Sequence, residues 1–151
     1  MSFYSVDIKP FKRIFYQTAI SNCIILSGAA LLASSGLLEA QITTTGNRLS
    51  QPILLGMVLV AWIHSVSQRK QLARIVTIEN FDQQIREYEK HYRRKMLWYF
   101  TACLISAILF IVTAKWIFLL FGVMDIVFSI AFFPRVNLFK RELQNDEIML
   151  Y

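Results

Sequence analysis

Asp125 is the side chain in this sequence with the greatest capacity for chemistry, because it stands near the middle of an apolar segment, 116–133. On insertion scales, a carboxylate at the centre of a membrane helix costs about 3 kcal/mol. Such a group is therefore neutral, paired or facing water. An acid within a membrane predicts a functional site, and the alternative is a structural anchor that hydrogen-bonds a neighbouring helix.

Polar side chains at a similar depth occur on three other apolar segments, namely Asn22, His64 and Thr101. Counted from the basic ends of the segments, Asn22 and Asp125 lie ~12 Å deep and His64 ~6 Å deep. Hydrogen bonds within this polar layer would hold helices together at about 0.6–2 kcal/mol each. The second interpretation is a proton relay, in which His64 and Asp125 exchange protons.

Cofactor chemistry has less support in this sequence. Cys23, Cys103, His64 and Asp125 are acceptable metal ligands, but no two of them share a helix at i,i+3 or i,i+4 spacing. The chain also has no Cys-x-x-Cys pair and no Gly-rich phosphate loop. We therefore expect no catalytic residue, no metal ion and no other cofactor.

Four apolar segments must position these side chains: 14–38, 52–68, 96–114 and 116–133. Each is near the ~20 residues that a helix needs to cross a bilayer. No other stretch is long enough to bury a core of its own. The sequence thus predicts an all-α membrane protein with four transmembrane helices, in a single domain over residues 1–151.

The basic residues give the orientation. Fourteen of the sixteen Lys and Arg residues fall on one side of the four segments, and only Arg48 and Lys115 fall on the other. Short basic loops stay in the cytoplasm, so we expect both termini there. Anionic headgroups attract basic residues at this level, which explains the net charge of +6 without a nucleic-acid partner. The short loops favour a bacterial inner membrane.

The first apolar segment carries a stripe of small residues, in which Ser21, Gly28 and Ser35 recur every seven positions. In lipid, small residues let two helix backbones approach closely. We expect this stripe to face the rest of the bundle or a partner chain.

Between the second and third segments, the pattern predicts a cytoplasmic amphipathic helix over 77–95. Its apolar residues follow 3-4-3-4 spacing and are Ile78, Phe81, Ile85, Tyr88 and Tyr92. Thr77 would cap its start. The stripe would pack on the protein's own tail or the membrane surface, dock a partner subunit, or pair with a second copy as a coiled coil.

The end of this helix meets the membrane at Arg93, Arg94 and Lys95, which mark the level of the lipid headgroups. No Gly or Pro occurs between Thr77 and Gly122, so the helix should continue without a break into the third segment.

The remaining connections are short. About two residues near Ala114–Lys115 join the third and fourth segments, which predicts a tight helical hairpin. Pro52 fits the first turn of the second span, and Pro134 ends the fourth. Val136, Phe139 and Leu143 then predict a short interfacial helix.

These features favour a non-catalytic accessory, assembly or oligomeric interaction subunit, in contact with anionic lipid headgroups and with a protein partner or further copies of itself. The alternative is a small proton- or cation-coupled transporter or channel that uses Asp125 and His64. A third hypothesis is a membrane immunity or exclusion protein.

Overall fold

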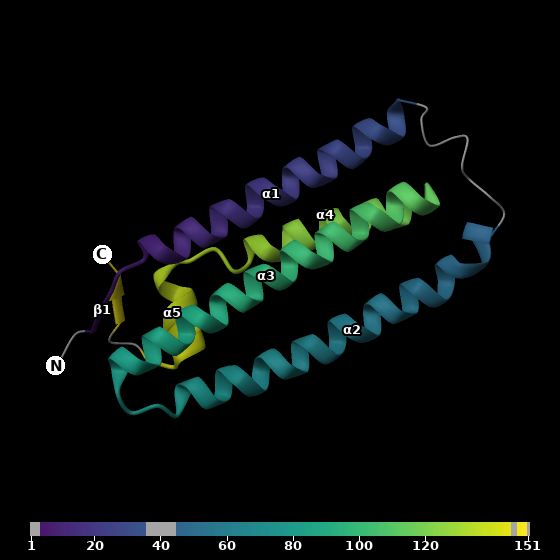
Figure 1. Cartoon of the computed structure of the whole chain (residues 1–151). Helices are drawn as coiled ribbons and strands as arrows, with labels where there is room; N and C mark the ends of the chain where they lie inside the picture. Colours follow the sequence, from purple (N-terminus) through teal and green to yellow (C-terminus); the bar gives the residue numbers. More distant parts are fainter. Residues whose placement is uncertain (1–3, 36–44, 146–147, 151) are drawn as a thin grey trace.

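The computed structural model describes residues 4–35, 45–145 and 148–150. Within these ranges the chain forms five helices and two three-residue strands (Figure 1). In chain order they are β1 (Tyr4–Val6), α1 (Lys9–Ser34), α2 (Thr45–Val76), α3 (Phe81–Thr113), α4 (Trp116–Ile130), α5 (Val136–Leu143) and β2 (Ile148–Leu150).

Among the described residues, three helices are long and apolar enough to cross a membrane: Lys9–Ser34, Gln51–Val76 and Phe81–Thr113. The fourth apolar helix, Trp116–Ile130, is shorter, and its 15 residues extend over ~22 Å. The predicted all-α class is confirmed at this level, and the three long helices indicate an integral membrane protein.

Helix α3 is the centre of the bundle. Helices α1 and α4 pack on it and touch each other, whereas α2 packs on α3 and, at its far end, on α5. The contact between α1 and α4 is close at Gly122, where a Cβ atom would lie 2.6 Å from Leu26 Cδ2. Helix α3 lies between α1 and α2, so α2 stands apart from α1 along most of its length (Figure 1).

The two ends of the chain meet at one end of the bundle. Strand β1 pairs in parallel with β2, with Tyr4 opposite Ile148 and Val6 opposite Leu150. Beside them, Phe139 of α5 packs against Phe11 of α1 and Tyr88 of α3. We call this assembly the terminal cap; its buried residues include Val6, Phe11, Phe15, Ile75, Tyr88, Tyr92, Leu138, Phe139, Leu143 and Ile148.

Phe11 lies at the centre of the terminal cap and is 1% exposed. Its ring centroid lies 5.8 Å from that of Tyr88, 5.3 Å from that of Tyr92 and 5.0 Å from that of Phe139. Edge-on and tilted contacts at such distances stabilise aromatic clusters beyond the area they bury. The cap thus ties both chain ends to the helices.

The start of the helix that was predicted over 77–95 differs in the structure. Helix α2 continues to Val76 and α3 begins at Phe81, so Ile78 lies in the turn between them. Thr77 is not the cap, because its hydroxyl donates to the carbonyl of Arg74 at the end of α2, 2.8 Å away. Asn80 caps α3 instead, accepting a hydrogen bond from the backbone N–H of Gln83.

Of the other local predictions, some are confirmed and some are wrong. The continuous helix into the third segment, the hairpin at Ala114–Lys115 and the short helix α5 are confirmed. The position of Pro52 is wrong, because α2 begins at Thr45 and contains this proline in its interior. Helix α4 ends at Ile130, before the expected end of its segment. Residues 36–38 of the predicted first span lie outside the described residues.

Candidate functional site: a groove between α2 and α4

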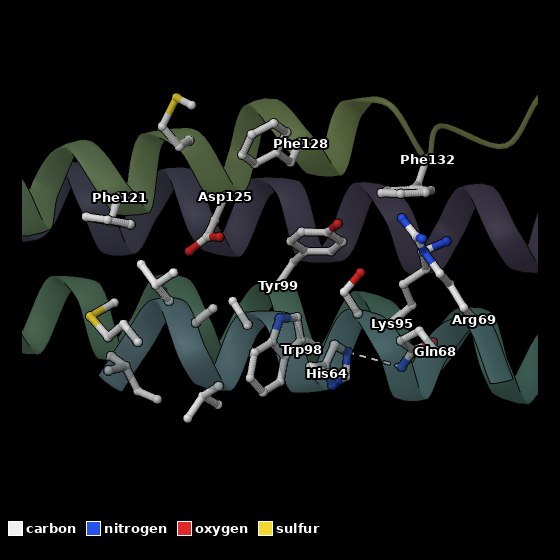
Figure 2. Close-up of a pocket in the computed structure, with 18 of the residues that line it drawn as sticks. His64, Gln68, Arg69, Lys95, Trp98, Tyr99, Phe121, Asp125, Phe128 and Phe132 are labelled. Carbon is white, nitrogen blue, oxygen red and sulfur yellow. Dashed lines mark hydrogen bonds between the residues drawn. The ribbon is translucent and has the colours of Figure 1, made fainter. Parts of the chain in front are cut away.

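A groove of about 1350 Å³ separates α2 from α4, with α3 as its floor and α5 at one end. Most of its wall is apolar and includes Met57, Val58, Val60, Ala61, Ile105, Ile117, Leu120, Phe121, Met124 and Phe128. Figure 2 shows side chains from α2 and α4 projecting into the same space. Of the two walls, α2 is long and apolar enough to cross a membrane, and α4 is a shorter apolar helix.

Helix α2 packs on α3, and one of these contacts is a stacked pair of rings. The ring of His64 stacks on Trp98 of α3, with centroids 3.9 Å apart and planes 10° from parallel. Gln68, one turn further along α2, donates its amide N–H to His64 Nε2 at 3.1 Å. Several large apolar residues of α2, such as Trp62 and Ile63, are exposed, as suits a helix in contact with lipid.

A buried ion pair closes the groove at the end next to the terminal cap. Lys95 Nζ lies 3.0 Å from Glu142 Oε1 and 3.5 Å from the centre of the Phe132 ring. The hydroxyl of Tyr88 donates to Glu142 Oε2 at 2.7 Å. Burial raises the pKa of Tyr88, and the Glu142 carboxylate raises it further. Burial also lowers the pKa of Lys95, although Glu142 acts in the opposite direction.

Two more basic side chains, Arg69 of α2 and Arg141 of α5, line the same end. Both are exposed, and neither makes a salt bridge with any residue that the structure describes. His91 lies beside them and is 3% exposed, and its Nδ1 has no hydrogen-bond partner. This end of the groove therefore carries three cations, Arg69, Lys95 and Arg141, and one carboxylate, that of Glu142.

The polar layer is brought together only in part. Asp125 and His64 both line the groove, and no hydrogen bond or salt bridge joins Asp125 to a described residue. Asn22 does not line the groove and is fully buried, and its backbone carbonyl oxygen accepts a hydrogen bond from Cys103 Sγ. Thr101 donates to the carbonyl of Trp98 within α3. Neither side-chain polar atom of Asn22 has a hydrogen-bond partner, so no hydrogen bond joins Asn22 to Asp125.

The small-residue stripe lies beside the face of α1 that packs against the rest of the bundle. This helix buries Asn22, Leu26 and Ala29. Ser21 and Gly28 directly precede Asn22 and Ala29, so each lies about 100° around the axis from that buried residue. Apart from the neighbouring residues and backbone of α1 itself, no atom that the structure describes lies within 4 Å of the position that a Cβ at Gly28 would take. Ser35 is exposed and donates to the carbonyl of Leu32. Among the residues that the structure describes, no side chain fills the space at Gly28.

The predicted partner-docking stripe is divided. Tyr88 and Tyr92 are fully buried in the terminal cap, which is packing on the protein's own tail, the first of the three alternatives. A partner cannot dock on these two side chains, so the prediction is corrected for them. Phe81 and Ile85 are half-buried at the edge of the cap, and docking there stays a prediction.

The predicted headgroup residues occupy different surroundings. Arg93 and Arg94 are exposed, and Arg93 pairs with Glu89 at 3.3 Å. Lys95 lies in the groove, paired with Glu142. The burial of Glu142 could have been predicted from the sequence, because Glu142 falls on the same helical face as Leu138 and Phe139. An acid on the apolar face of a short amphipathic helix predicts a buried partner.

No group of three or more His, Cys, Asp or Glu side chains suited to a metal ion occurs among the residues that the structure describes. Comparison with known protein families, with curated proteins and with solved structures finds no match for this chain. The groove and its basic end are therefore interpreted from their own geometry.

Proposed function

We propose that this protein crosses the membrane four times, with α1, α2, α3 and α4 as its spans and both termini in the cytoplasm of a bacterium. The pairing of β1 with β2 supports this topology, since it holds both chain ends at the same end of the bundle. Backbone hydrogen bonds also extend α4 by a turn, to Phe133, which brings its length closer to that of a membrane span.

Within this topology we propose a non-catalytic assembly subunit that pairs through α1 with a helix of another chain or of a second copy. The observation that carries the proposal is the open space at Gly28 on a stripe of small residues. Small residues on a lipid-facing helix surface favour helix pairing, because close backbone approach replaces the missing hydrophobic drive. Such a surface has no evident role in an isolated chain.

The test is the native mass of the complex after gentle extraction into lipid nanodiscs, with every co-purifying chain identified. Gly28→Leu should dissociate the complex, because its side chain would block the close approach. Ser27→Leu is the matched control, since Ser27 is exposed at the same depth on another face of α1. An unchanged complex in Gly28→Leu, or equal loss in both variants, would exclude pairing through this stripe.

The second candidate function is a small proton- or cation-coupled transporter. It is favoured by one observation, that Asp125 and His64 line the same membrane-embedded groove. Reconstituted protein should then show flux that depends on pH, and Asp125→Asn should abolish it. Asp82→Asn is the control, because Asp82 is an exposed acid at the start of α3. Equal flux in both variants would rule out a role for Asp125.

A further inference from the structure

We propose that the groove between α2 and α4 binds one anionic phospholipid, with its phosphate at the basic end and its acyl chains along the apolar walls. This inference is independent of the helix pairing proposed for α1, which lies on the opposite side of α3 from α2 (Figure 1).

The polarity of the groove changes along its length as that of a phospholipid does. Arg69, Lys95 and Gln68 gather at the end nearest Phe132, whereas Phe121 lies towards the other end (Figure 2). Between Gly56 and Leu72, both of which line the groove, α2 rises ~24 Å. One leaflet contributes about half of a ~30 Å hydrocarbon core, so the groove is long enough to take acyl chains over their full depth.

The basic end has unused capacity to bind an anion. Arg69 and Arg141 make no salt bridge to a described residue, and a guanidinium group matches the geometry of a phosphate. His91 Nδ1 and Gln68 Oε1 are buried polar atoms of the groove wall without a hydrogen-bond partner. Buried polar atoms normally have a partner, and a headgroup with donors and acceptors would supply one.

The level of this end in the membrane also fits a headgroup. Arg69 and Lys95 stand at the cytoplasmic ends of their apolar segments, and Trp98 and Tyr99 line the groove one turn further in. Trp and Tyr are typical of the membrane interface. Basic pockets between helices on the cytoplasmic side recognise anionic headgroups, and the adjacent leaflet is the source that supplies them.

Trp98 provides a direct probe of the occupant. The chain contains three tryptophans, Trp62, Trp98 and Trp116, so Trp62→Phe/Trp116→Phe leaves Trp98 as the only one. This protein is reconstituted in nanodiscs of phosphatidylcholine with a small fraction of brominated phosphatidylglycerol. If the groove binds phosphatidylglycerol, the brominated form of this lipid should quench Trp98 fluorescence at a far lower mole fraction than brominated phosphatidylcholine needs.

Removing charges at the groove and beside it distinguishes binding at a site in the groove from general attraction of anionic lipid to basic residues. Arg69→Gln/Arg141→Gln should weaken the preference for phosphatidylglycerol roughly 30-fold, since each basic residue near a headgroup contributes measurably to binding. The control is Lys70→Gln/Arg94→Gln, which removes the same charge from exposed residues that do not line the groove. It should leave the preference within about twofold of the parent protein.

Three outcomes would overturn the proposal. Equal quenching by the two brominated lipids means that ordinary surrounding lipid fills the groove. Equal loss in the two double variants means that the attraction is not local to the groove. Protection of Trp98 from both lipids, with a second chain in the purified particle, means that a protein helix occupies it. Native mass spectrometry that finds one anionic phospholipid per chain, lost in Arg69→Gln/Arg141→Gln, would support it.

Discussion

The ion pair between Lys95 and Glu142 predicts a large loss of stability in Glu142→Gln, which replaces one carboxylate oxygen with an NH2 group. The two side chains are 12% and 8% exposed, and 3.0 Å separates their charged atoms. Glutamine keeps the oxygen that accepts the hydrogen bond of Tyr88 but removes the negative charge. The ammonium group of Lys95 then stays buried without a counter-charge.

Burial sets the size of this effect. Loss of one partner of a buried ion pair costs about 3–5 kcal/mol, so Glu142→Gln should lower the free energy of unfolding by about that amount. The matched control is Glu87→Gln. Glu87 pairs with Lys90 at the shorter distance of 2.7 Å, but the side chains of Lys90 and Glu87 are 63% and 42% exposed, and exposed pairs contribute about 0.2–1 kcal/mol.

The assay is equilibrium unfolding in mixed micelles, with a rising mole fraction of denaturing detergent and with circular dichroism as the signal. A double variant, Lys95→Met/Glu142→Leu, should recover most of the loss, because it removes both charges from the buried site. The reasoning would be refuted if Glu142→Gln and Glu87→Gln cost the same, or if the double variant were no more stable than Glu142→Gln.

Three further variants test other parts of the fold by the same unfolding assay. Gly122→Val should cost about 1–3 kcal/mol by overpacking against Leu26, whereas Gly56→Val, with nothing within 4 Å, should change stability by less than about 0.5 kcal/mol; equal costs would contradict the close packing of α1 and α4. Phe11→Ala should cost about 3–5 kcal/mol and expose the terminal cap to protease, and a protease-resistant cap would count against its central place. Burial, together with the charge of Lys95, lowers the pKa of His91 below its ordinary value of 6.5, so the unfolded chain takes up a proton first. Stability should therefore fall as the pH drops below 6.5, and an equal fall in His91→Gln would assign it to other groups.

Local sequence patterns were sufficient to predict that these helices exist, but several of the predicted bounds were wrong. The break between α3 and α4 follows from two residues between apolar segments, and α5 follows from three apolar residues at helical spacing after Pro134. The start of α3 was misplaced because both Thr77 and Asn80 can cap a helix. The hydroxyl of Thr77 bonds to the end of α2, and only the folded turn shows which of the two caps α3.

The strands and the groove were beyond such patterns for different reasons. Tyr4–Val6 and Ile148–Leu150 pair across almost the whole chain, and three residues carry too little alternation to indicate a strand. Helix α2 is apolar on nearly every side, so its sequence does not show which face meets α3. The basic end of the groove could not be predicted either, because it needs α5 to bring Arg141 to the end of α2 that carries Arg69.

The terminal cap and the groove are not separate units, because they share Glu142. This residue accepts the hydrogen bond of Tyr88 on the cap side and pairs with Lys95 on the groove side. Loosening the cap at Phe11 should therefore also release Lys95 and weaken anion binding, although Phe11 does not line the groove. Two sites that depend on one packed element are coupled through its folding equilibrium. A Phe11→Ala variant that lost cap protection but kept its full preference for phosphatidylglycerol would show that the groove holds its basic end without the cap.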